Sequence, residues 1–326
     1  KILLALNQAY ELDGADYRST PSIGVTLFMG HKDSVDELLK RADVAMYQAK
    51  SAGRNTLRFF DPGMQAAVMA RAALEEEIRE GLKKNQFLLH YQGQVDQFGK
   101  LVGSEALIRW QHPQRGLLLP ADFIPLAEEI GLILPLGQWV LDTACKQLVA
   151  WAGQPETMHL RLAVNLSVYQ VRHPDFVAQV LRIMKETGAN PSRLKLEITE
   201  TLLFDNVEDT IAKMTLLKSS GVGFSLDDFG TGYSSLSYLK RLPLDELKID
   251  QSFVRDVCAG GYDTAIVNTI VTLAQSLGMV VIAEGVETQV QRDVLATQGC
   301  YQYQGYFFDR PGPADHLHMS SSTTGA

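Results

Sequence analysis

From Gln86 onward the chain repeats one pattern, in which a short apolar run of strand length is in most cases followed by an amphipathic helical segment. Strands that alternate with helices favour an α/β fold with a mostly parallel sheet. We predict strands near residues 87–92, 101–109, 160–167, 193–199, 222–227, 244–249, 279–284 and 299–306. Eight such strands in about 240 residues predict a (β/α)₈ barrel. An open doubly wound sheet is less favoured, because no glycine-rich phosphate fingerprint follows the first strand.

The first sixty residues show a smaller pattern of their own. Ser22–Phe28 is β-rich, residues 35–49 follow a helical period, and residues 56–60 return as a strand. Asp61-Pro62-Gly63 breaks the chain, so we place a domain boundary there. We therefore expect a small α+β fragment over 1–61, the barrel over 62–313 and a flexible tail over 314–326.

The charge and the cysteines limit the class of function. The formal net charge is −8, and no basic stripe could release counterions from a polyanion, so we expect no polymeric nucleic acid as a partner. The three cysteines form no C-x-x-C pair, which predicts a reducing, cytoplasmic location. No apolar run approaches the roughly 18 residues that suggest a membrane span. A membrane-anchored sensor that contains this chain as its cytoplasmic part stays open.

The strand predicted at 222–227 ends in two adjacent carboxylates, Asp227 and Asp228, before a glycine-containing loop. Adjacent carboxylates repel each other unless a cation lies between them. Two divalent ions roughly 3.5–4 Å apart would satisfy the pair, and that arrangement suits phosphoester hydrolysis. Taken alone, Asp-Asp is more often a helix N-cap or a solvated turn.

Other polar residues recur at or near the carboxyl ends of the predicted strands, where barrel active sites lie. They are Glu105, Arg109, Asn165, Glu197, Lys248, Glu284, Glu287 and Gln304. Uncompensated carboxylates are costly in strands that a barrel buries, so several on one rim need cations. Carboxylates with one amide suit Mg²⁺ or Mn²⁺ better than zinc. Lys248 either forms a structural ion pair or positions an attacking water.

Seven motifs in order resemble a complete EAL domain over about residues 65–312. They are Glu105-Ala106-Leu107 with Arg109, Asn165-x-Ser167, Glu197-x-Thr199-Glu200, Asp227-Asp228-Phe229-Gly230-Thr231-Gly232, Leu247-Lys248-Ile249-Asp250, Glu284-Gly285-Val286-Glu287 and Gln304-Gly305-Tyr306. The resemblance implies a TIM-like barrel whose first strand runs antiparallel. It also implies hydrolysis of cyclic di-GMP to linear pGpG with two divalent cations.

The resemblance further implies how the cations are held. One would be bound by Glu105, Asn165, Glu197 and Asp227. The other would be bound by Asp227, Asp228 and Glu284. These cations are Mg²⁺ or Mn²⁺, two in each site, and Ca²⁺ is expected to inhibit because its larger shell fits such a site poorly. Glu105 and Glu284 thereby count among the expected catalytic residues.

Roles away from the metals also follow from the resemblance. Lys248 would engage the nucleophilic water and Arg109 a substrate phosphate. Glu287 and Gln304 would organise the water network. Glu200 would tether the loop from Phe229 to Leu236, which in the family lies close to a dimer interface, so a homodimer is expected.

One motif departs from the family pattern. Where the family usually has Tyr-Gln-Pro after the first strand, this chain has Tyr91-Gln92-Gly93. Glycine removes the fixed φ of proline, so the placement of Gln92, an expected substrate contact, depends on something else.

The N-terminal piece resembles the C-terminal third of a GGDEF (diguanylate cyclase) domain. The resemblance is carried by Ser22-Ile-Gly-Val-Thr-Leu, the helix through Ala42–Lys50, and Gly53-Arg54-Asn55. The signature motif of that family and its nucleotide-binding half are not in the sequence. The resemblance therefore implies a truncated module without cyclase activity.

Two other functions compete with hydrolysis of cyclic di-GMP. A non-hydrolysing cyclic di-GMP receptor would be expected to lack ligand-type residues, whereas every expected ligand is present here. A metal-dependent hydrolase for another phosphodiester would need the same residues, so substrate profiling alone separates it.

Overall fold

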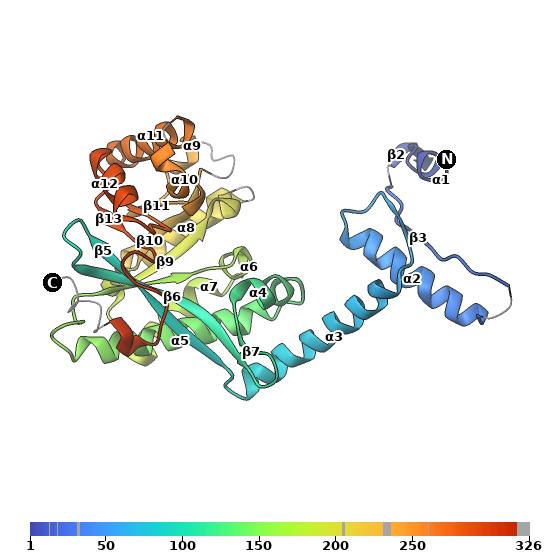
Figure 1. Ribbon diagram of the computed structural model, residues 1–326, viewed down its shortest axis with the longest axis horizontal. Coiled ribbons are helices and arrows are strands. Elements are labelled where there is room, and N and C mark those ends of the chain that lie inside the picture. The colour runs from blue at the N-terminus through green and yellow to red at the C-terminus, as the bar shows by residue number, and fades with distance from the viewer. Residues whose placement is uncertain are drawn as a thin grey trace. The chain divides into compact units, whose positions relative to one another are not determined.

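The computed structural model describes residues 1–12, 14–17, 19–30, 33–203, 206–230, 236–259 and 261–317. The chain forms two compact units, Lys1–Ile78 and Arg79–Ala326, both drawn in Figure 1. The boundary predicted at residue 61 lies at the start of helix α3 (Pro62–Lys83), which runs through this division. None of the described helices combines the length and the apolar character that crossing a membrane requires.

In the first unit, helix α2 (Val35–Ser51) packs on two short parallel strands, β3 (Ile23–Val25) and β4 (Leu57–Phe59). The Ser34 hydroxyl accepts a hydrogen bond from the Glu37 backbone N–H at 3.2 Å and so caps the helix. A Cβ at Gly24 would lie 2.0 Å from the Ala42 carbonyl oxygen, so only glycine permits this close approach. The unit also contains α1 (Ile2–Leu6), β1 (Tyr10–Leu12) and β2 (Ala15–Tyr17).

The second unit contains a closed eight-stranded barrel, which confirms the predicted fold. Its strands, in their order around the barrel, are β5 (Phe87–Asp96), β13 (Gln302–Tyr303), β12 (Val280–Ala283), β11 (Glu246–Ile249), β10 (Gly223–Phe229), β9 (Leu194–Thr199), β8 (Arg161–Asn165) and β6 (Leu101–His112). Strand β5 pairs antiparallel with both β6 and β13, and the other neighbours run parallel. The expected antiparallel first strand is therefore also confirmed.

Helices cover the outside of the barrel (Figure 1). They are α4 (Pro120–Glu129), α5 (Ile133–Ala152), α6 (Val168–Arg172), α7 (Phe176–Thr187), α8 (Val207–Ser219), α9 (Leu236–Leu239), α10 (Gln251–Arg255), α11 (Tyr262–Ser276) and α12 (Gln289–Thr297). Short 3₁₀ turns are η1 (Pro191–Arg193), η2 (Glu200–Leu203), η3 (Val257–Ala259) and η4 (Ala314–His316). One continuous apolar core lies between helices and strands, so the polar residues of the strands are left to the barrel interior.

The structure differs from the sequence predictions in several places. Strands β5 and β6 extend to Asp96 and His112, beyond the predicted ends at residues 92 and 109. An additional short strand, β7 (Gly116–Leu118), pairs with the end of β6. The last strand covers two residues instead of 299–306, because the backbone after Gln304 turns to bond with Val286: Val286 N–H donates to Gln304, and Phe307 N–H donates to Val286. Residues 314–317, expected in the tail, form a turn that ends at buried Leu317.

Candidate active site

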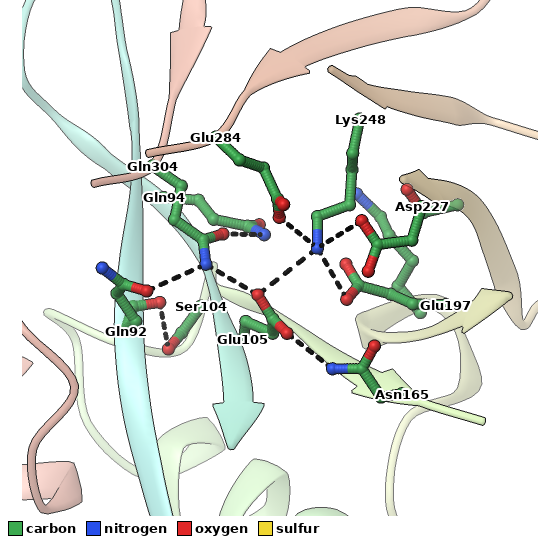
Figure 2. A network of polar contacts seen from close by, with 12 residues as sticks. Gln92, Gln94, Ser104, Glu105, Asn165, Glu197, Asp227, Lys248, Glu284 and Gln304 are labelled. Carbon is green, nitrogen blue, oxygen red and sulfur yellow. Dashed lines mark hydrogen bonds and ion pairs between the residues drawn. The ribbon is translucent and has the colours of Figure 1, made fainter. Parts of the chain in front are cut away.

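The centre of the site is the ammonium group of Lys248, whose side chain is fully buried inside the barrel (Figure 2). Lys248 comes from β11 and its Nζ contacts carboxylates from four other strands or strand ends. They are Glu284 Oε1 at 2.5 Å, Glu197 Oε2 at 2.8 Å, Glu105 Oε2 at 3.3 Å and Asp227 Oδ1 at 3.4 Å. A single cation therefore holds together carboxylates that the sequence spreads over 180 residues.

Strand register explains why these side chains meet. Gln92 lies opposite Glu105 in the antiparallel pair β5–β6, and Asn165 lies opposite Glu197 in the parallel pair β8–β9. Side chains that point to one face recur every two residues along a strand. Strand pairing therefore places Gln92 beside Glu105, and Asn165 beside Glu197, inside the barrel.

Amides extend the network from Glu105 (Figure 2). Asn165 Nδ2 donates to Glu105 Oε1 at 2.5 Å, and Gln304 Nε2 donates to Glu105 Oε2 at 2.6 Å. Gln304 Nε2 also donates to Gln92 Oε1 at 3.1 Å, and Gln94 Nε2 donates to Gln304 Oε1 at 3.0 Å. Both oxygens of Glu105 are thus fixed by partners from different strands.

Burial, together with the charges of the cluster, shifts the pKa values of its residues. Burial raises the pKa of Glu197 well above its ordinary value and that of Glu284 to about 8. Burial and the neighbouring carboxylate raise the pKa of Asp228 to about 6. Burial alone would raise the pKa of Glu105, but the Lys248 ammonium and neighbouring hydrogen bonds lower it. Burial also opposes the charge on Lys248, yet the surrounding carboxylates raise its pKa well above its ordinary value.

The residues present fit a site for divalent cations. Asp227, Asp228 and Glu284 each offer an oxygen, and these oxygens lie within 4.8 Å of one another, so the acidic group could hold a metal. Glu197 Oε1 is buried and has no hydrogen-bond partner among the described residues, which leaves a lone pair without a donor. When all five carboxylates of the site are ionised, the Lys248 ammonium balances one of the five negative charges, and two divalent cations would balance the remaining four. The five are Glu105, Glu197, Asp227, Asp228 and Glu284.

A cavity of about 260 Å³ opens beside this cluster. Its lining residues are Gln92, Glu105, Leu107, Asp227, Gln251, Glu284, Gly285, Glu287, Gln304, Gly305 and Tyr306. Glu287 therefore faces the cavity without contacting Lys248. Arg109 lies two positions beyond Leu107 on β6 and donates to the Ile108 carbonyl at 2.9 Å. Burial lowers the pKa of Arg109, and the charge of Glu105 opposes that change, so Arg109 interacts electrostatically with the network.

Two polar residues that support this network, Gln94 and Ser104, are not among the residues that the sequence predicts. Gln94 was not singled out, although it follows Gln92 by two residues on the same strand and therefore shares its face. Ser104 was also missed; its hydroxyl donates to the Gln92 carbonyl at 2.9 Å. The period of two along β5 could have identified Gln94, whereas no local signal identifies Ser104.

Glu200 lies outside the cluster, at the start of η2, and holds the chain just after Asp228. Its Oε1 accepts a hydrogen bond from the Gly230 backbone N–H at 2.9 Å, and its Oε2 is buried with no partner among the described residues. Gly230 has a φ of +99°, a conformation that favours glycine. The rest of the loop expected to be tethered, residues 231–235, lies outside the described residues.

We predict that Glu200→Ala and Glu200→Gln both lower turnover strongly and leave thermal stability nearly unchanged. Glu200→Ala loses the Gly230 contact, and Glu200→Gln weakens it, because a neutral amide oxygen is a poorer acceptor than a carboxylate. Asp228 could then shift, and a displacement of about 1 Å can cost roughly 100-fold in rate. Raised Mg²⁺ or Mn²⁺ should restore part of the turnover. Steady-state kinetics over a range of Mg²⁺ or Mn²⁺ concentrations measure turnover, and thermal melting curves measure stability. Near-normal turnover in both variants would show that Glu200 serves only as a first-turn carboxylate, worth about 0.3–1 kcal/mol.

Comparison with known families and solved structures shows which proteins this chain resembles. The EAL domain model matches residues 75–311, and the model of the diguanylate cyclase GGDEF domain matches residues 1–56. A solved structure of the MucR phosphodiesterase in complex with cyclic di-GMP superimposes with a TM-score of 0.73 at 43% identity, over 75% of this chain and 99% of that one. The EAL enzyme Bd1971, bound to cAMP and cyclic di-GMP, superimposes with a TM-score of 0.74 at 32% identity, over 89% of this chain and 76% of that one.

Curated relatives are longer than this chain. The bifunctional diguanylate cyclase/cyclic di-GMP phosphodiesterase MucR of Pseudomonas aeruginosa is 42% identical over 98% of this chain and 47% of its own length. The cyclic di-GMP phosphodiesterase PdeR of Escherichia coli is 36% identical over 96% of this chain and 47% of its own length. The chain thus spans about half the length of these relatives. Through its barrel and ordered motifs, it belongs to the EAL domain family, and a short GGDEF segment precedes that domain.

Proposed function

We propose that this chain hydrolyses cyclic di-GMP to linear pGpG with two bound divalent cations, Mg²⁺ or Mn²⁺. The observation that carries the proposal is the buried cluster in which Lys248 meets four carboxylates beside an open cavity. A receptor that only binds would have no use for so many costly buried charges. Relatives named as cyclic di-GMP phosphodiesterases support the choice of substrate.

In this proposal five acidic residues and Asn165 hold the cations. One set is Glu105, Asn165, Glu197 and Asp227, and the other is Asp227, Asp228 and Glu284. When bound, two such cations lower the pKa of a water and stabilise the attacking and leaving oxygens of a phosphodiester.

The remaining residues would bind the substrate and orient water and the metal ligands. Lys248, held by carboxylates on several sides, keeps its ammonium at the centre of the site, where it would position the nucleophilic water and offset negative charge. Gln304 bridges Glu105 and Gln92, so it would orient a ligand residue and a substrate contact together. Glu287, on the cavity wall, would order water there. Arg109 would reach a phosphate from the neighbouring part of β6.

The test is to incubate the purified chain with cyclic di-GMP and Mg²⁺ or Mn²⁺ and to separate the products by chromatography. We expect pGpG in either metal, no product in EDTA, and little or none in Ca²⁺ alone. Binding without product in Mg²⁺ and Mn²⁺ would favour the receptor. Equal turnover of unrelated phosphodiesters would point to a broader hydrolase, and full turnover in Ca²⁺ alone would contradict the proposed metal site. A homodimer through the EAL domain stays a prediction, to be measured by light scattering.

We predict that this chain does not convert GTP to cyclic di-GMP. Residues 1–56 match part of a GGDEF domain, and the signature motif is not in the sequence. Incubation with GTP and Mg²⁺ or Mn²⁺, followed by the same chromatography, makes the measurement. Because hydrolysis would remove any cyclic di-GMP formed, the Glu105→Ala variant is assayed in parallel. Metal-dependent synthesis by either protein would overturn the prediction.

A further inference from the structure

The residue that follows the expected substrate contact Gln92 is Gly93, where the family usually has proline. In this structure a hydrogen bond replaces the fixed φ that a proline would impose. The Gly93 backbone N–H donates to the Oδ2 of Asp309 at 3.2 Å, across a sequence separation of 216 residues. A proline has no N–H and could not make this bond.

Asp309 holds the Gln92 side chain as well. Gln92 Nε2 donates to the Asp309 backbone carbonyl at 3.1 Å, while Gln92 Oε1 accepts from Gln304. Both polar ends of the Gln92 amide are therefore fixed, one by the C-terminal segment and one by the network of Figure 2. Gln92 and Asp309 are 7% and 8% exposed, so water competes little for these bonds.

The segment around Asp309 is itself fastened to β5. Tyr91 N–H donates to the Gly312 carbonyl at 2.7 Å, and Gly312 N–H donates to the Tyr91 carbonyl at 3.1 Å. His316 Nε2 lies 3.3 Å from Asp309 Oδ1, and the turn ends with Leu317 in the core. Burial raises the pKa of Asp309, and the Gly93 N–H and His316 oppose that rise. The carboxylate thus has a donor on each oxygen.

We infer that Asp309 is a positioning residue for the proposed hydrolysis, which fixes the first strand at Gly93 and thereby places Gln92 for the substrate. The inference rests on the proposed function, and it explains how the chain tolerates glycine at this position. Asp309 touches no reacting atom. Its effect passes through the Gly93 N–H and through the Gln92 amide.

The first test is a double-mutant cycle of Asp309→Ala and Gln92→Ala. A displacement of about 1 Å in a positioning residue can cost roughly 100-fold, so we expect Asp309→Ala to lower kcat/KM by up to roughly that factor, mainly as a raised KM. In the Gln92→Ala background, Asp309→Ala should cost no more than about twofold, because the residue through which it acts is gone. Additive losses would overturn the inference. Asp315→Ala, an exposed change in the same segment, is the matched control and should leave KM unchanged.

The second test is rescue by proline. Gly93→Pro alone should lower kcat/KM, because it removes the N–H and sets the ring against the Asp309 carboxylate. In the Asp309→Ala background the ring gains room and restores a fixed φ, so Gly93→Pro should bring activity back to within about threefold of wild type. A Cβ at residue 93 would lie 2.8 Å from Leu101 Cδ1, the tip of a side chain that can move. A further loss in the double variant would contradict the inference.

A third measurement separates this inference from the proposed function. Hydrogen exchange of the backbone amides of Tyr91–Gly93, followed in the ligand-free chain by mass spectrometry, needs no activity. Asp309→Ala should speed exchange there and leave exchange in β9 unchanged, whereas Asp315→Ala should change neither. Faster exchange, together with a wild-type chain that does not hydrolyse cyclic di-GMP, would reject the proposed function but support the role of Asp309 in fixing Gly93. Unchanged exchange in Asp309→Ala would reject this role of Asp309, whatever the activity of the chain.

Discussion

Replacing Glu105 by alanine should reduce hydrolysis of cyclic di-GMP by more than roughly 100-fold, since removing even outer contacts of a metal ligand typically costs about 10–100-fold. Glu105 is 5% exposed, and its two oxygens are held by Asn165 and Gln304, with Lys248 beside them. Its loss would remove a proposed metal ligand and leave two buried amides without their acceptor. Initial rates at saturating Mg²⁺ or Mn²⁺ make the measurement. We expect the same loss for Asp227→Ala.

A matched control separates the chemistry from a general loss of barrel stability. Glu246 is likewise buried in the barrel interior, but it lies at the first residue of β11 and pairs with Lys195 and Ser225. Glu246→Ala should lower the melting temperature and retain turnover at a temperature where the protein is folded. Equal loss of turnover in Glu105→Ala and Glu246→Ala would show that Glu105 matters for the fold rather than for the reaction.

Replacing Lys248 by methionine should abolish turnover and, in EDTA, lower the free energy of unfolding by roughly 3–5 kcal/mol, as breaking a buried ion pair does. The fully buried ammonium is the shared counter-ion of four carboxylates, which would then face one another without it. Mg²⁺ should recover part of that stability, because bound cations supply the missing positive charge. Urea unfolding in EDTA and in excess Mg²⁺ measures both effects.

Lys195→Met is the matched control for this change. Lys195 is also buried in the barrel interior, but it faces the single carboxylate of Glu246 and lies away from the acidic cluster. It should lose stability by the same amount with and without Mg²⁺. If Mg²⁺ restores Lys248→Met no more than Lys195→Met, then the acidic cluster does not bind cations in the proposed manner.

The sequence by itself predicted the barrel and most of the residues that the structure brings together around Lys248. Strand-length apolar runs alternating with helical segments predict the barrel because the two periods, 2 and 3.6, are local properties of the chain. Asp227 and Asp228 lie near the carboxyl end of β10, and parallel strands bring their carboxyl ends to one rim, although Glu105 lies in the middle of β6. The resemblance to the EAL domain assigns an expected role to each of these positions, and the match to the EAL family model confirms the resemblance itself.

Other features depend on contacts between residues far apart in sequence. Lys248 could be assigned either to an ion pair or to catalysis from the sequence, and only the closed barrel shows that it meets four carboxylates at once. The extent of the last strand was wrong because Val286 captures the backbone after Gln304. From the sequence, Gly93 removes the fixed φ that proline would supply, and nothing nearby in the chain replaces it. Only the folded structure shows that Asp309, 216 residues away, accepts the Gly93 N–H. Local patterns specify which face a side chain takes, whereas closure of the barrel and docking of the C-terminal segment decide which partner it finds there.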